Sequence, residues 1–141
     1  ILDKILFASG EATISGKGRD VLKRVGKVLA TARDKDKVIR IEGHTDTVPI
    51  SAKLKEKFAT NWELSTARAT TVVRFLAEPS KIPPDAFEAA GLGEYYPIAK
   101  NDTPAGRQQN RRIEIILYPR VSSLMEELPK LKLAPVGEAK P

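Results

Sequence analysis

The chain has 141 residues, with 24 basic and 18 acidic side chains, a net charge of +6 and no cysteine. This length suffices for one domain with a hydrophobic core, and no apolar run reaches the ~20 residues that span a membrane. The absence of cysteine excludes disulfides and thiolate chemistry. With one histidine, a zinc site would need carboxylates for most of its ligands, so no metal or cofactor is expected. The positive charge favours an anionic partner such as nucleic acid, anionic lipid or an acidic wall polymer.

The first half of the chain alternates apolar segments with polar turns. Residues 2–7 form a short segment with four apolar residues and are expected to form a strand. Ser15 suits the N-cap of a helix that runs to about Ala32. Its apolar positions at helical spacing are Val21, Leu22, Val25, Val28, Leu29 and Ala32. Residues 38–43 alternate as a strand, and residues 47–60 form a polar loop.

The second half continues with a second amphipathic helix over residues 61–76, for which Asn61 is the expected N-cap. A strand is expected at residues 87–92, followed by a long loop at 93–109. Residues 112–118 alternate clearly and predict the last strand.

This order, β-α-β-α-β-β, indicates an α+β fold in which a mixed sheet carries its helices on one face. Residues 1–120 are expected to form one domain. Residues 121–141 read as a proline-containing C-terminal tail that docks at most one short amphipathic turn.

Arg68 is the unusual residue of the second helix, because it lies in the middle of the apolar arc. The neighbours on that arc are Leu64, Ala67, Thr71, Val72 and Phe75. A guanidinium stays charged in a protein, so an inward-facing arginine needs an anion. Either Asp46 supplies that anion in a structural salt bridge, or a ligand supplies it.

Three other residues join Arg68 as candidates. Asp46 directly follows a strand, where it is either an Asx-turn acceptor or a ligand-binding carboxylate. Asn61 is either only a helix cap or part of an anion-attracting helix start. Arg111 shares the parity of Ile113 and is expected to face inward as a second cation. One carboxylate and two guanidiniums would complement a zwitterion.

Catalysis is not expected, because no nucleophile has a positioned base. Glu42, His44 and Asp46 alternate along one strand face, but a metal site there is not expected.

Three motifs resemble the OmpA-like peptidoglycan-binding domain, a family that includes the C-terminal domain of OmpA, Pal lipoproteins and the stator protein MotB. They are Gly43-His44-Thr45-Asp46, Asn61-x-x-Leu64-Ser65-x-x-Arg68-Ala69 and Gly106-Arg107-x-x-Asn110-Arg111-Arg112-Ile113-Glu114. The resemblance covers residues 5–118. Asp46 and Arg68 are 22 positions apart because the intervening loop is long, and this loop looks more like the MotB branch.

The resemblance implies noncovalent binding of a peptidoglycan stem that contains diaminopimelate. Asp46 would pair with the diaminopimelate ammonium and Arg68 with its carboxylate, while the turn at Ser9-Gly10 would approach the ligand. The residues expected to bind or order the ligand are Asp46, Arg68, Arg111, Asn61, Ser65, Thr45 and Gly10.

The resemblance also implies a noncatalytic periplasmic domain that ties a membrane-attached protein to the cell wall. Its membrane anchor, in the inner or outer membrane, would lie outside this segment. The alternative is a dimerisation domain of a stator-like complex, a homodimer in which Asp46 and Arg68 satisfy each other. Nucleic acid is not an expected partner, because the basic residues are scattered and lack an aromatic platform.

Overall fold

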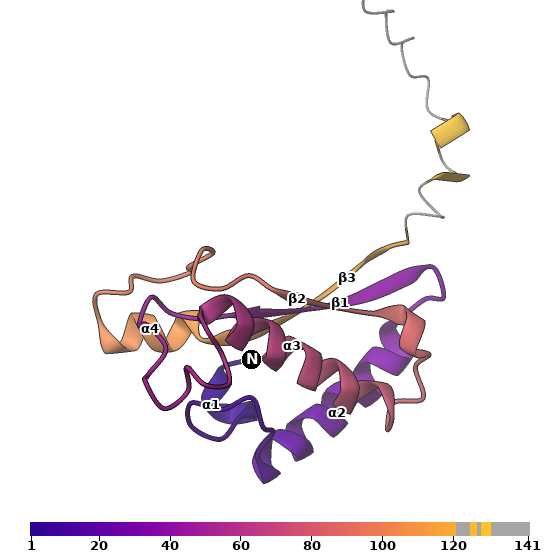
Figure 1. Cartoon of the computed structure of the whole chain (residues 1–141). Helices are drawn as coiled ribbons and strands as arrows, with labels where there is room; N and C mark the ends of the chain where they lie inside the picture. The colour runs from indigo at the N-terminus through magenta and orange to yellow at the C-terminus, as the bar shows by residue number, and fades with distance from the viewer. Residues whose placement is uncertain (121–124, 127, 131–141) are drawn as a thin grey trace, which may run out of the picture.

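A three-stranded mixed sheet lies at the centre of this computed structural model (Figure 1). Its strands are β1 (Lys37–His44), β2 (Phe87–Gly91) and β3 (Arg112–Pro119), in the order β2-β1-β3. β1 pairs in parallel with β2 and antiparallel with β3. The parallel pair requires a crossover, which a helix between the two strands provides. The predicted α+β class with a mixed sheet is confirmed.

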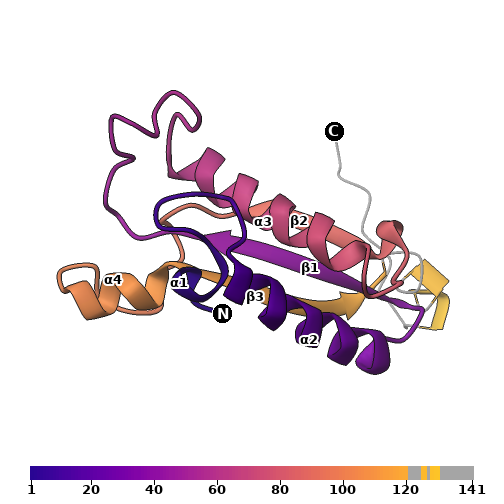
Figure 2. The ribbon, with the colours of Figure 1, turned by 90° about the horizontal axis from the view of Figure 1, so that it is seen from below.

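Two long helices, α2 (Gly16–Ala32) and α3 (Asn61–Ala77), lie side by side on one face of the sheet, as Figure 2 shows from below. Ser15 caps α2 as predicted, because its Oγ accepts a hydrogen bond of 3.0 Å from the Gly18 N–H. The prediction that Asn61 caps α3 is wrong. Thr60 is the N-cap and forms a capping box with Glu63, so Asn61 is the first helical residue.

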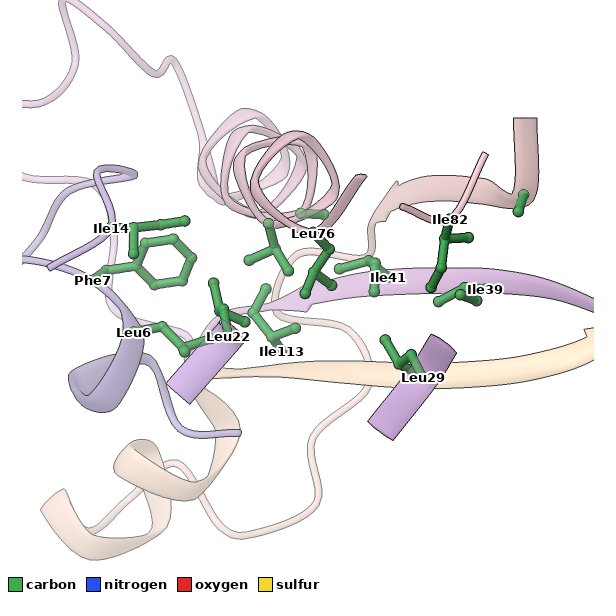
Figure 3. Packing of buried hydrophobic residues seen from close by; sticks show 13 residues of the cluster. Leu6, Phe7, Ile14, Leu22, Leu29, Ile39, Ile41, Leu76, Ile82 and Ile113 are labelled. Atoms are coloured by element: carbon green, nitrogen blue, oxygen red, sulfur yellow. The ribbon is translucent and has the colours of Figure 1, made fainter. Parts of the chain in front are cut away.

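The hydrophobic core fills the space between these helices and the sheet (Figure 3). Its largest fully buried apolar side chains are Leu6, Leu22, Ile39, Ile41, Leu76, Val72 and Ile113. The predicted face of α2 was too wide, since Val28 is 65% exposed and Ala32 is also exposed. The buried residues of α2 are Gly18, Leu22, Gly26 and Leu29, a narrow stripe from which Val28 is displaced around the helix.

Helix α3 packs closely against the carboxyl ends of β1 and β2. A Cβ on Gly43 would lie 2.1 Å from the Ser65 carbonyl oxygen, and one on Gly91 would lie 1.9 Å from Thr66 Oγ1. Only glycine allows this approach. The first turns of α3 are therefore held at the end of the sheet where β1 stops.

The predicted first strand is wrong, because Asp3–Leu6 forms a single helical turn, α1. Leu2 and Phe7 on either side make only isolated bridges, to Arg112 and Ile14. A short apolar run does not distinguish strand from helix by periodicity, and here burial of Leu6 against the long helices decides the conformation.

The predicted loop at 93–109 contains a further helix, α4 (Pro104–Asn110). Thr103 caps it by accepting a hydrogen bond of 3.0 Å from the Gly106 N–H, and Pro104 occupies the first helical position, where proline is favoured. Arg111 is consequently the C-cap of α4, not a residue of the strand β3.

The remaining short elements are the 3-10 turns η1 (Pro84–Ala86) and η2 (Leu128–Lys130). The structure describes residues 1–120, 125, 126 and 128–130, so the predicted tail lies largely outside the described residues. The domain boundary at residue 120 stays a prediction. None of the helices in the described part of the chain has both the length and the apolar character needed to cross a membrane.

Candidate functional site

A pocket of about 530 Å³ lies beyond the end of β1, lined by residues of α1, the 47–60 loop, α3 and α4. Six of the seven predicted site residues line it: Asp46, Arg68, Arg111, Asn61, Thr45 and Gly10. The Asp3 carboxylate also lines the pocket. Its apolar lining residues include Phe7, Val48, Pro49, Ile50 and Leu54.

Arg68 points inward as predicted and is only 4% exposed. Its Nε donates to the Glu11 carbonyl oxygen at 2.9 Å, and its Nη1 donates to Asp3 Oδ2 at 3.1 Å. Its guanidinium carbon also lies 5.0 Å from the centre of the Phe7 ring, a cation–π contact. Burial lowers the pKa of Arg68, and the Asp3 carboxylate opposes this shift. An arginine side chain is not deprotonated in proteins, so Arg68 stays charged at neutral pH.

Asp46 is paired with Arg111 instead of Arg68. Arg111 Nη1 donates to Asp46 Oδ2 at 2.6 Å, while Asp46 Oδ1 accepts from the Val48 N–H at 3.0 Å. Asp46 is thus both an Asx-turn acceptor and a pocket carboxylate. The predicted structural pair of Asp46 with Arg68 is not formed, because α1 places Asp3 beside Arg68.

The inward orientation predicted for Arg111 came from strand parity, and this reason is wrong because Arg111 ends α4. Its side chain nevertheless reaches the pocket, with about 30% of its surface exposed. The Arg111 side chain is directed toward Asp46 by its place at the end of α4, and not by the alternation of residues along a strand.

Asn61 holds the start of the 47–60 loop. Its Nδ2 lies 3.2 Å from the Asp46 carbonyl oxygen and 3.1 Å from that of Val48. Thr45 is buried, and its hydroxyl donates to the Asp46 carbonyl oxygen at 2.9 Å. Both side chains therefore fix the backbone that carries the Asp46 carboxylate.

Gly10 and Ser65 differ in their relation to the pocket. Gly10 lines it with φ of +69°, a conformation that favours glycine, and a Cβ there would lie 3.5 Å from Leu54. Ser65 does not line it. Its Oγ donates to the Trp62 carbonyl oxygen and accepts from the Gly93 N–H, so Ser65 fastens α3 to the segment after β2.

Asp3 and Gln108 are pocket residues that the sequence reasoning missed. Asp3 Oδ2 lies 3.1 Å from Arg68 Nη1 and 3.6 Å from Arg111 Nε. Gln108 donates to Asp3 Oδ1 at 3.2 Å and accepts from Arg111 Nη2 at 3.1 Å. Asp3 was not predicted as a pocket residue, because residues 2–7 were expected to form a strand and not the helical turn α1. Gln108 lies one helical turn before Arg111, a signal that recognition of α4 would have supplied.

A second polar cluster lies on the other face of the sheet. Glu42, His44 and Glu114 place their ligand atoms within 4.8 Å of one another, so Glu114, not Asp46, completes the set. Both carboxylates already accept 2.8 Å hydrogen bonds from guanidiniums, Glu42 from Arg40 and Glu114 from Arg112. An ion-pair network accounts for these contacts. That no metal binds here stays a prediction.

The OmpA family model matches residues 6–111. The chain belongs to the OmpA family. Motility protein B of Bacillus subtilis is 39% identical over 120 residues, which are 85% of this chain and 44% of that protein. The outer-membrane lipoprotein YfiB of Pseudomonas aeruginosa is 36% identical over 114 residues, which are 81% of this chain and 62% of that protein. This OmpA-family chain thus spans less than two thirds of either relative.

Solved structures agree with this assignment. A MotB-like protein from Desulfovibrio vulgaris matches with a TM-score of 0.76 and 31% identity, over 85% of this chain and 71% of that one. The cell wall anchor of the T6SS from Pseudomonas aeruginosa matches with a TM-score of 0.75 and 30% identity, over 85% and 79%. The OmpA-like, MotB-like fold predicted from the three motifs is confirmed.

Proposed function

We propose that this OmpA-family domain binds peptidoglycan noncovalently through the pocket beyond β1. The observation that carries the proposal is the position of Arg68, a permanent charge that is 4% exposed and lines a pocket shared with Asp46 and Arg111. Buried guanidiniums are well suited to bind carboxylates. A solved relative that is named as a cell wall anchor supports the same polymer as the partner.

The proposed ligand group is the diaminopimelate of the peptide stem. Its side chain ends in an ammonium and a carboxylate, which Asp46 and Arg68 would bind. Arg111 lines the same pocket and is paired with Asp46 in this structure. The methylene chain of diaminopimelate would lie against the apolar side chains of Ile50 and Leu54, which line the pocket.

The proposed role is mechanical attachment, not catalysis. His44, the only histidine of the chain, does not line the pocket. The Thr45 hydroxyl already donates to a backbone carbonyl oxygen and is not activated by a base. In the full-length protein the domain would act in the periplasm, tethered to a membrane-attached segment. Homodimerisation also stays a prediction. Analytical ultracentrifugation of the purified domain would measure its oligomeric state.

Co-sedimentation with purified sacculi tests the binding proposal. Asp46→Ala and Arg68→Ala are each expected to weaken retention about tenfold or more, because each leaves one ligand charge without its partner. Arg74→Ala is the matched control, since Arg74 is an exposed arginine on the same helix and does not line this pocket.

Circular dichroism must show that the variants are folded. Equal retention of the wild type, both pocket variants and the control would contradict the proposal.

A further inference from the structure

Asp3 is the central carboxylate of the pocket's ion pairs. Two carboxylates line the pocket, Asp3 and Asp46. Of these, only Asp3 has two guanidinium partners: its Oδ2 lies 3.1 Å from Arg68 Nη1 and 3.6 Å from Arg111 Nε. Asp46 is paired with Arg111 alone, at 2.6 Å. The pairs therefore form a chain in the order Arg68, Asp3, Arg111, Asp46, with two positive and two negative groups.

Gln108 keeps two members of this chain together. Its amide donates to Asp3 at 3.2 Å and accepts from Arg111 at 3.1 Å. In addition, the Asp3 N–H donates to the Arg111 carbonyl oxygen at 2.9 Å. Asp3 and Arg111 are thus fixed next to each other by contacts that do not depend on the outer two pairs.

A ligand with one ammonium and one carboxylate must replace pairs at both ends of the chain. If its ammonium takes Asp46, Arg111 loses its 2.6 Å partner, and if its carboxylate takes Arg68, Asp3 loses its 3.1 Å partner. A charge that is left unpaired in a partly buried site is costly. The two groups that are released are Arg111 and Asp3, and they are already neighbours.

We infer that Asp3 is an exchangeable internal counter-ion, which pairs with Arg68 in this structure and passes to Arg111 when a zwitterionic ligand takes Arg68 and Asp46. This inference rests on the proposed function. After the exchange every charge in the chain has one partner, so the site selects a ligand end that carries both charges. Lys4 also lines the pocket but is exposed, so water and salt screen its charge.

The selectivity follows from what each incomplete ligand leaves behind. A ligand with only an ammonium pairs with Asp46, so Arg111 loses that partner. Asp3 is then the one carboxylate left for two guanidiniums, Arg111 and Arg68. A ligand with only a carboxylate must displace Asp3 from Arg68 while Arg111 stays occupied by Asp46. Both situations leave one charge of the site undercompensated, whereas the zwitterion leaves none.

Calorimetry with three synthetic stem tripeptides tests the inference. The third residue is diaminopimelate (ammonium and carboxylate), lysine (ammonium only) or 2-aminopimelate (carboxylate only). Wild type is expected to bind the diaminopimelate peptide most tightly. Asp3→Asn is expected to weaken the lysine peptide and strengthen the 2-aminopimelate peptide, which changes the ratio of their dissociation constants about tenfold or more.

The matched controls separate a local effect from a change in net charge. Asp20→Asn removes the same charge from an exposed position on α2, and Asp3→Glu retains the charge at the site. Both are expected to keep the wild-type order of ligands. Asp3→Ser serves as a second neutral variant if Asp3→Asn does not fold.

The outcomes are distinct. An unchanged ratio in Asp3→Asn and Asp3→Ser, or the same change in Asp20→Asn, would overturn the role of Asp3 while leaving peptide binding intact. Failure of the wild type to bind the diaminopimelate peptide would overturn the proposed function and the inference together.

Discussion

Arg68 and Arg112 are both buried arginines, at 4% and 6% exposure, yet their surroundings give them different chemistry. Arg112 lies in β3, where Glu114 and the carbonyl oxygens of Asn110 and Tyr96 accept its hydrogen bonds. Arg68 has a carboxylate and a carbonyl oxygen, but it also lines a pocket. Burial demands an anion in both cases, but of these two arginines only Arg68 lines the pocket that we propose as the ligand site.

His44 is the residue for which we predict a pH dependence of stability. His44 is 3% exposed, and burial is the main cause that lowers the pKa of His44. The nearby Arg112 charge lowers this pKa further, while the hydrogen bond of the ring to the Glu42 carboxylate opposes the shift. The unfolded state, with a pKa of about 6.5, therefore binds the proton first as the pH falls. The contribution of neutral His44 to the free energy of unfolding is therefore fully present above about pH 6.5 and is lost as the pH falls below that value.

Melting temperatures at pH 7, 6 and 5 check this prediction. His44→Gln is expected to show a smaller loss of melting temperature than wild type over that interval. The hydrogen bond from Arg112 also lowers the pKa of Glu114, but that effect begins near the carboxyl range of about 4.3. Parallel pH profiles for wild type and His44→Gln would contradict the assignment.

At the scale of elements, the site depends on how closely α3 approaches β1. Gly43 lies against the Ser65 carbonyl, and α3 supplies both Asn61 and Arg68 to the pocket. Asn61 in turn binds the backbone on either side of Thr47. A displacement of α3 would therefore move Arg68 and loosen the loop at the same time.

Gly43→Ala is expected to lower the free energy of unfolding by about 1–3 kcal/mol, because the added methyl overpacks the contact between α3 and β1. It is also expected to weaken binding to sacculi. Gly16→Ala is the matched control, since a Cβ at Gly16 meets nothing within 4 Å. Urea denaturation measures both variants. Equal free energies of unfolding for Gly43→Ala and Gly16→Ala would contradict the prediction that the packing of α3 on β1 requires glycine at position 43.

At the scale of the whole molecule, the net charge of +6 acts separately from the pocket. Exposed lysines such as Lys53, Lys55 and Lys57 attract any anionic polymer. Salt screens such exposed charges far more than buried pairs. Retention on sacculi should therefore contain a nonspecific part that salt removes and a pocket part that persists.

Raising NaCl from about 0.1 M to about 0.5 M, which shortens the screening length to roughly 4–5 Å, is expected to lower retention of both wild type and Asp46→Ala. The ratio between them is expected to widen, because the shared nonspecific part decreases. Co-sedimentation at both salt concentrations gives this ratio. A ratio that falls to one at high salt would mean that the surface charge, not the pocket, accounts for retention.

Local patterns in the sequence were sufficient for α2, α3, β1, β2 and β3, because their periodicity reflects burial of one face. The same periodicity placed Arg68 on the inner side of α3, and three motifs indicated the OmpA family. The position of Asp46 directly after a strand was sufficient to predict it as a candidate ligand-binding carboxylate. The helices, strands and the inward position of Arg68 are predictable because each depends on residues within one or two helical turns, or on a few consecutive strand residues.

The conformation of Asp3–Leu6, the helix α4 and the pairing of the pocket charges depended on tertiary structure. Asp3 meets Arg68 across 65 positions, and Arg111 meets Asp46 across another 65. Burial of Leu6 in the core holds α1 in place, and the turn of α4 directs Arg111. Local periodicity carries no information about contacts between such distant segments, so only packing could decide which carboxylate lies beside which guanidinium.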